Sequence, residues 1–182
     1  RVEARHDACV DGSFLSRLRI DGGAWSDATR VLNGRDGQKV WEDAMDLLRL
    51  TDAAYLCGVM AAALAMSLDY LRLRHQFGVP IGSFQALQHR AADCHVQWAS
   101  ARALVQEAAA AYGTPSGRFA AAASVHRAKA AALHVTKENI QFHGAIGFAD
   151  EHDAGLYLRR AMVLAARHSD SMQVLRECGG RS

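Results

Sequence analysis

The stretch from Leu47 to Leu71, LLRLTDAAYLCGVMAAALAMSLDYL, decides the fold. Apolar residues recur along it at alternating steps of three and four, at Leu47, Leu50, Ala54, Cys57, Ala61, Leu64, Leu68 and Leu71. That spacing places them on one face of a long α-helix. We expect this helix to begin near Gln38 and to end near Phe77 and Gly78, because Pro80 cannot continue a helix.

Three further helices follow, separated by short turns. Ser83 is a good N-cap for the second helix, and the Gly113–Gly117 turn ends it. The third helix ends in the glycine-containing segment 143–147, and the fourth runs from about Glu151 to Gly179. The predicted core face of the second helix carries Phe84, Leu87, Ala91, Cys94, Trp98, Ala101, Val105, Ala108 and Tyr112, and that of the third carries Val125, Ala128, Ala132, Val135 and Phe142. Four helices with short connections predict a mainly α fold, an up-down-up-down four-helix bundle.

The N-terminal stretch differs from the rest of the chain. Residues 14–20, FLSRLRI, alternate apolar and polar side chains as a β-strand does, and residues 1–5 also have strand character. Two short strands do not form a stable sheet alone. We therefore divide the chain into residues 1–36, the remnant of a β-domain or a docking arm, and residues 37–182, the helical bundle. Because the chain does not start with Met, we expect a processed or truncated product of something longer.

Composition argues against several classes of function, namely nucleic-acid binding, membrane binding and metal binding. The 182 residues are 50% hydrophobic and 22% charged, with a formal net charge of +2 that gives no reason to expect nucleic acid or an anionic membrane as partner. We find neither a signal peptide nor the run of 18 apolar residues that a membrane span needs. The four cysteines form no CxxC pair, and no Glu-x-x-His occurs in the predicted helices, since Glu3 and His6 belong to the N-terminal strand segment, so we expect no metal site. A reducing compartment, the cytoplasm, is the expected location.

Three local features lie where function tends to concentrate. Residues 70–88, YLRLRHQFGVPIGSFQALQ, bring a cation, aromatic rings and amides to one helix junction, with a well-capped helical hairpin as the alternative. Residues 141–160, QFHGAIGFADEHDAGLYLRR, have glycines that permit close backbone approach, with an acidic-capped helix connection as the alternative. Arg49 is the third feature, and its simplest interpretation is a solvated surface arginine or one paired with Asp46 or Asp52.

Two of these features together carry a resemblance. RHQFGVPIGSFQALQHRAAD and QFHGAIGFADEHDAGLYLRRA resemble two segments of the C-terminal domain of acyl-CoA dehydrogenases, in the same order and about two helices apart. The resemblance covers roughly residues 43–165, and the N-terminal strands are similar to the end of that family's middle β-domain. It implies FAD as cofactor, bound between the β-domain and the bundle, and completed by a neighbouring subunit. It also implies an acyl-CoA substrate, a place in fatty acid metabolism, and a homodimer or homotetramer.

The resemblance also implies site residues. Arg49 lies where the family keeps an arginine near the acyl-CoA. The residues that match family positions around the flavin are Arg74, Gln76, Phe77, Phe84, Gln85, Gln141 and Gly144. Their chemistry agrees, because arginine gives charge-assisted hydrogen bonds to phosphate and glycine permits backbone approach. Ala145 replaces the second glycine of the family loop.

The family's catalytic carboxylate is missing from both of its usual positions. The family reaction is α,β-desaturation of an acyl thioester, in which a carboxylate removes the α-proton and flavin takes the β-hydrogen as hydride. His168 and Leu48 stand at the two positions, and Asp170, two residues beyond His168, is a weaker candidate.

Three functions follow from this pattern. The first is the FAD-contacting and oligomerisation domain of an acyl-CoA dehydrogenase-like flavoprotein, inactive as this chain alone. The second is a non-catalytic partner subunit of a heteromeric acyl-CoA dehydrogenase, and the third is a purely structural four-helix bundle.

Overall fold

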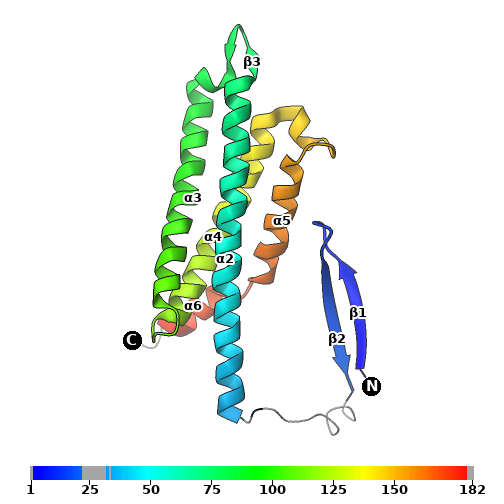
Figure 1. Ribbon diagram of the computed structural model, residues 1–182, viewed down its shortest axis with the longest axis vertical. Coiled ribbons are helices and arrows are strands. Elements are labelled where there is room, and N and C mark those ends of the chain that lie inside the picture. Colours follow the sequence, from blue (N-terminus) through cyan, green and yellow to red (C-terminus); the bar gives the residue numbers. More distant parts are fainter. Residues whose placement is uncertain (1, 22–31, 33, 180–182) are drawn as a thin grey trace.

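The computed structural model describes residues 2–21, 32 and 34–179, and confirms the helical bundle. Long antiparallel helices alternate in direction, and a β-hairpin stands beside them (Figure 1). The helices are α2 (Gly34–Leu73), α3 (Gln85–Ala111), α4 (Gly117–His143), α5 (Ala154–Arg167) and the short α6 (Ser171–Gly179). Helix α4 packs against all the others, so the core lies along it.

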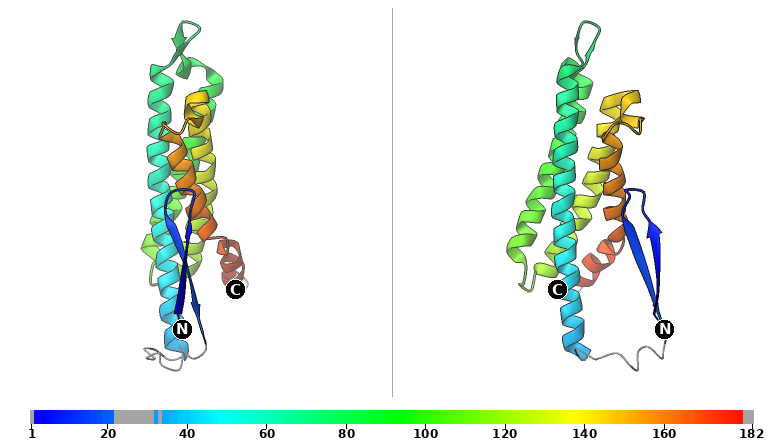
Figure 2. Two further views of the ribbon diagram at one scale, coloured as in Figure 1. Left: turned by 90° about the vertical axis from the view of Figure 1, so that its right-hand side faces the viewer. Right: turned by 45° about the vertical axis from the view of Figure 1, so that its right-hand side comes forward.

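The N-terminal hairpin pairs β1 (Val2–Ala8) with β2 (Phe14–Ile20), Val2 opposite Ile20. The predicted strand over residues 14–20 is therefore confirmed to the residue. The two additional views in Figure 2 place the tip of the hairpin next to α5 and its far end away from the bundle. At the tip, the Arg160 guanidinium donates to Asp11 Oδ2 at 2.8 Å, which ties the hairpin to α5.

Both ends of α2 differ from the prediction. The helix begins at Gly34 rather than Gln38, and it ends at Leu73, several residues before Phe77. After α2 the chain forms a tight hairpin of β3 (His75–Gln76) and β4 (Val79–Pro80), then the 3₁₀ turn η1 (Ile81–Ser83). The Ile81 amide bonds the Arg74 carbonyl at 2.8 Å and so closes the base of this hairpin, which competes with one more helical turn.

The N-cap prediction for α3 was wrong by one residue. Phe84 occupies the cap position, in extended conformation, whereas Ser83 belongs to η1. The Ser83 hydroxyl donates to the Pro80 carbonyl at 2.7 Å, so it stabilises the turn before the helix instead of the helix itself.

The buried face of α2 coincides with the predicted one only in part. Cys57, Leu64 and Leu71 are buried as predicted, but Leu47 and Ala54 are exposed, and the fully covered positions include Ala53, Leu56 and Met60. Helix α2 contacts α3, α4 and α5, and its composition is apolar around most of its circumference. The three-four spacing therefore did not single out the face that is packed deepest. The predicted core face of α4 was correct, since all five of its predicted positions are buried.

The predicted fourth helix is two helices. Helix α5 ends at Arg167, the turn from His168 to Asp170 interrupts it, and α6 follows. The 3₁₀ segment η2 (Gly144–Phe148) and a turn precede α5, which begins at Ala154 rather than Glu151.

Helix α2 also departs from the expectation about membrane-length segments. An 18-residue window within it reaches a mean hydropathy of 1.5, enough by length and composition to cross a membrane. About 44% of that window is buried inside the bundle. A core helix of a bundle meets the same criteria, and the buried positions of α2 lie in the hydrophobic core with those of α4.

Candidate functional site

The β3–β4 hairpin displays the first group of predicted residues at one end of the bundle. Arg74, Gln76 and Gln85 are exposed, and the Phe77 ring is 92% exposed. Phe77 and Gly78 have φ angles of 53° and 81°, the conformation that a two-residue hairpin turn of this kind requires. A phenylalanine there costs about 1–2 kcal/mol in backbone strain. An exposed aromatic held in a strained turn marks a place where function is expected.

Phe84 supports this hairpin from the start of α3. Its ring meets the edge of Phe77 with the centroids 6.1 Å apart and the planes at 80°. Such an edge-to-face contact limits the motion of an otherwise free ring. The first predicted group is therefore brought together as one small exposed platform.

The second predicted group lies where α4 ends, at the same end of the bundle (Figure 1). Gln141 is exposed, and Gly144 adopts a φ of 61° that L side chains rarely take. At Gly147 an added Cβ would lie 2.5 Å from the Ile140 carbonyl oxygen, so only glycine fits this turn. Phe148, at the end of η2, is 75% exposed.

Aromatic and polar contacts beneath the surface join the two groups, and the sequence had not indicated them. Tyr70 stacks on His143 with the centroids 4.4 Å apart, and His143 in turn meets His152 at 4.6 Å. The His143 Nδ1 donates to the Asn139 carbonyl at 2.7 Å, and burial lowers the pKa of His143, so the ring stays neutral near pH 7. The Ser67 hydroxyl, fully buried, donates to Asn139 Oδ1 at 2.7 Å. These contacts fix the end of α2 against the end of α4.

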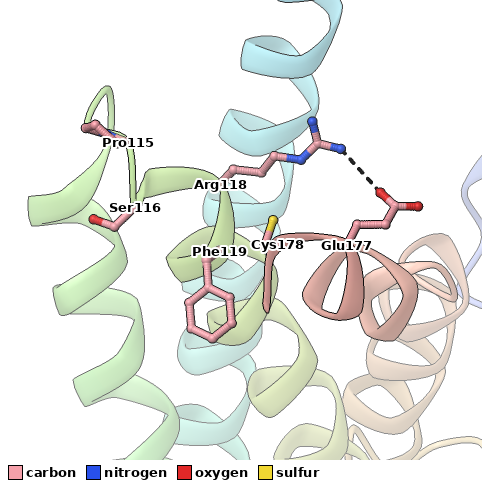
Figure 3. Close-up of a pocket in the computed structure, with 6 residues that line it drawn as sticks. All are labelled: Pro115, Ser116, Arg118, Phe119, Glu177 and Cys178. Carbon is pink, nitrogen blue, oxygen red and sulfur yellow. Dashed lines mark ion pairs between the residues drawn. The ribbon is translucent and has the colours of Figure 1, made fainter. Parts of the chain in front are cut away.

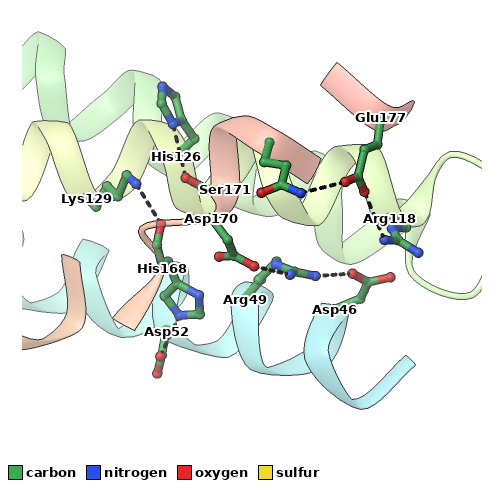
Figure 4. A network of polar contacts seen from close by, with 11 residues as sticks. Asp46, Arg49, Asp52, Arg118, His126, Lys129, His168, Asp170, Ser171 and Glu177 are labelled. Atoms are coloured by element: carbon green, nitrogen blue, oxygen red, sulfur yellow. Dashed lines mark hydrogen bonds and ion pairs between the residues drawn. The ribbon is translucent and has the colours of Figure 1, made fainter. Parts of the chain in front are cut away.

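Arg49 lies elsewhere, about 36 Å from Leu73 along the axis of α2 at 1.5 Å per residue. The prediction of a surface arginine was wrong, because its side chain is only 6% exposed. Its guanidinium donates to Asp46 Oδ1 and to Asp170 Oδ2, both at 2.9 Å (Figure 4). The predicted pairing with Asp46 is confirmed. Burial raises the pKa of Asp46, against the opposing effect of Arg49.

Asp52 is the centre of a second group of polar contacts, beside the contacts of Arg49 with Asp46 and Asp170. Its Oδ2 lies 2.8 Å from His168 Nε2 and accepts a bond from Arg167 at 2.9 Å. His168 has no exposed surface, and its carbonyl accepts a 2.7 Å bond from the Lys129 ammonium on α4. Figure 4 shows the contacts of His168 with Asp52 and Lys129 at the α5–α6 turn. The sequence indicated Asp52 only as a partner for Arg49, because a residue 116 positions away from His168 leaves no local pattern that would predict their contact.

The comparisons with known proteins match this architecture. The family model "Acyl-CoA dehydrogenase, C-terminal domain" matches residues 35–167, most of the chain. The chain belongs to the acyl-CoA dehydrogenase family. It is 45% identical over 116 residues to the acyl-CoA dehydrogenase IpdE2 of Mycolicibacterium smegmatis, which covers 64% of this chain and 36% of that protein.

Solved acyl-CoA dehydrogenase structures agree in fold. Butyryl-CoA dehydrogenase from Megasphaera elsdenii superposes with a TM-score of 0.75 at 31% identity, over 81% of this chain and 39% of that one. The ChsE4-ChsE5 complex from Mycobacterium tuberculosis gives a TM-score of 0.83 at 26% identity, over 98% of this chain and 48% of that one. The chain thus spans less than half the length of these relatives.

A separate hollow lies at the end of the bundle opposite the β3–β4 hairpin. A cavity of about 390 Å³ opens between the α3–α4 turn and α6, beside the Arg118 guanidinium, which lies 3.7 Å from Glu177 Oε2 (Figure 3). Arg118 also pairs with Glu42 at 3.0 Å. No residue predicted to contact flavin lines this cavity of the acyl-CoA dehydrogenase domain, so we assign it no part in the site.

Proposed function

We propose that this chain is the FAD-contacting and oligomerisation domain of an acyl-CoA dehydrogenase-like flavoprotein that desaturates an acyl-CoA thioester. The observation that carries the proposal is the position of the two predicted groups. Arg74, Gln76 and Phe77 on the β3–β4 hairpin and Gln141 at the end of α4 are exposed at the same end of one bundle. A ring contact between Tyr70 and the buried His143 joins α2 to α4 at that end.

The residues present fit a dinucleotide cofactor. The Arg74 guanidinium forms no ion pair with another residue in the described part of the chain and suits a diphosphate, which it would bind through planar, charge-assisted hydrogen bonds. Phe77 offers an uncovered ring to adenine, and Gln76, Gln85 and Gln141 offer amides. When bound, FAD supplies a hydride acceptor. The chain's own residues bind and orient it.

The same end of the bundle suits contact with another subunit. Leu73, Phe77, Ile146 and Phe148 expose between 49% and 92% of their surface there. Exposed apolar side chains that gather in one region mark interaction sites. A homodimer or homotetramer in which one bundle completes the flavin site of another would cover them. A cytoplasmic location is proposed on the free cysteines alone.

We further propose that the chain alone does not turn over an acyl-CoA. A flavin held only at the exposed hairpin and the α4 end would lack a water-excluding site around the reacting carbons. Purified chain, FAD, a panel of acyl-CoA thioesters and an artificial electron acceptor test this. Steady reduction of the acceptor would contradict it.

A second candidate is a non-catalytic partner subunit in a heteromeric enzyme. His168 and Leu48, at the two positions where the family carries its base, favour it. The likeness to a chain of the ChsE4-ChsE5 complex, itself a complex of two proteins by its name, points the same way.

Native mass spectrometry of the purified protein beside its visible absorption separates the two candidates. A yellow homo-oligomer with FAD supports the first. Co-purification with a longer chain that has a glutamate at either base position supports the second. A colourless assembly of this chain alone would mean that the chain is a fragment or a support module, whose β-domain and base come from another polypeptide.

A further inference from the structure

The loop that joins α4 to α5 depends on one histidine. The last part of this loop, residues 149–153, leads into α5 at the end of the bundle that carries the β3–β4 hairpin (Figure 1). The His152 Nδ1 accepts a 3.1 Å bond from the backbone amide of Ala154, the first residue of α5. Asp153, the N-cap residue, makes no side-chain capping bond. His152 therefore caps α5 in its place.

This capping bond requires a neutral imidazole. A neutral ring has one nitrogen that accepts a hydrogen bond, whereas the charged ring has a proton on both nitrogens and only donates. Ala154 is fully buried, so its amide has no water to replace the lost acceptor. The charged ring would also lie at the positive end of the α5 dipole. Capping and protonation at His152 therefore exclude each other.

The inner side of the His152 ring is aromatic. Its centroid lies 4.6 Å from that of His143 on α4, and Tyr70 of α2 stacks on His143 at 4.4 Å. Burial lowers the pKa of His143 below its ordinary value of 6.5, and the nearby His152 lowers it further. A charge on His152 would therefore lie against a buried ring that itself resists protonation.

The outer side of His152 is acidic. Glu151 and Asp153, its neighbours in the chain, are both exposed. Asp150 has 94% of its side chain exposed and pairs with Arg159 of α5 at 3.6 Å. These carboxylates attract a charged imidazole toward the solvent, away from the first amide of α5. Protonation thus both removes the capping bond and favours an outward position of the ring.

We propose that His152 is a pH-sensitive switch, which holds the α4–α5 loop in place when neutral and releases it when protonated. Histidine changes its charge between about pH 8 and 5, so the loop is held at the upper end of this range and released at the lower end. The backbone bonds that remain, from Ala149 to the Ile146 carbonyl and from His152 to the Ala149 carbonyl, lie within the loop itself. The loop carries Gly144 and the exposed Phe148, so an effect of the switch on FAD rests on the function proposed above, whereas the switch itself does not.

The test follows the Ala154 amide and the imidazole nitrogens of the purified protein by NMR between pH 8 and 5.5. At pH 8 we expect opposite tautomers, with the His152 proton on Nε2 and the His143 proton on Nδ1. As the pH falls, the hydrogen-exchange protection factor of Ala154 should decrease about tenfold, because it loses one buried hydrogen bond. His152→Asn keeps an acceptor oxygen but cannot titrate, so its protection factor should not change with pH. His134→Asn, at an exposed histidine of α4, should behave like the wild type.

The outcomes separate the switch from its alternatives. A constant protection factor in the wild type, or a His152 proton on Nδ1 at pH 8, would overturn the proposal. A decrease that persists in His152→Asn would assign the pH response to His143 and overturn it as well. In the assembled flavoprotein, FAD affinity should fall with pH in the wild type and less in His152→Asn. If Ala154 responds as expected and FAD affinity does not, the switch is supported and the place of this loop in the proposed flavin site is contradicted.

Discussion

Removing the carboxylate of Asp52 is the sharpest test of how the bundle holds its α5–α6 turn. The Asp52 side chain is 12% exposed and its Oδ2 serves both His168 and Arg167. In Asp52→Ala the covered His168 ring loses its partner at Nε2, and Nδ1 already has none. Breaking a buried pair from one side costs about 3 kcal/mol at the lower end of the usual range. For a chain of this size that lowers the unfolding midpoint by about 6–12 °C.

The assay is thermal unfolding followed by circular dichroism at a helical band, with two companion variants. Asp52→Asn keeps an acceptor for His168 and loses only the charge facing Arg167, whose side chain is 36% exposed, so the loss should be about 1 kcal/mol or less. Asp69→Asn removes a carboxylate from an exposed pair with Arg72 and should change little. If Asp52→Ala unfolds within 1 °C of Asp69→Asn, the buried cluster does not hold the turn and the reasoning fails.

Three further predictions concern the glycines, the hairpin tip and the cysteines. Gly147→Ala should unfold at a lower temperature than wild type because its Cβ would overlap the Ile140 carbonyl oxygen. Gly58→Ala lies in open space on α2 and should raise the free energy of unfolding by up to about 1 kcal/mol, so equal unfolding midpoints for the two variants would contradict the geometry. Hydrogen bonds from Ser13, and secondly from Arg160, lower the pKa of Asp11 to about 2, below its ordinary value of 3.8. The stability that the ionised Asp11 contributes is therefore present above pH 4 and is lost as the pH falls through 2, and a carboxyl NMR titration with a midpoint near 4 would refute this. Burial raises the pKa of Cys94 to about 12, so at pH 8 iodoacetamide should label Cys9 and Cys178 long before it labels Cys94. Peptide mass spectrometry measures the labelling of each cysteine, and equal rates would contradict the burial of Cys94.

The sequence predicted those parts of the fold that depend on local patterns. The strand over residues 14–20 alternates cleanly, and the core face of α4 has a regular three-four spacing, so both were found correctly. Helix α2 is apolar on several sides, so its spacing pointed to a face that includes the buried Cys57, Leu64 and Leu71 but misses the fully covered Ala53 and Leu56. The end of α2 was placed too late because the β3–β4 hairpin depends on a phenylalanine at positive φ, which no propensity favours.

The candidate site was predictable only in part, for a related reason. Exposed residues next to one another in the sequence, such as Gln76 and Phe77, were identified through the resemblance and do share one surface. The break at His168 was not identified, because it is fixed by contacts with Asp52 and Lys129 that lie far away in the sequence. Polar contacts between residues that are far apart in the sequence produce no periodic sequence pattern from which they could be predicted. They also explain why Arg49, which looked like a surface residue, is buried.

We propose that the β3–β4 hairpin and the end of α4 hold FAD. The most direct measurement is the FAD affinity of the assembled flavoprotein carrying Arg74→Ala together with Gln141→Ala, compared with the wild type by fluorescence titration. We expect the double variant to fold with the wild-type helical content and to bind FAD at least about tenfold more weakly, because the loss of a charge-assisted hydrogen bond is worth about 1.5–3 kcal/mol. Unchanged affinity in the folded double variant would contradict the cofactor assignment and leave a purely structural bundle as the better description.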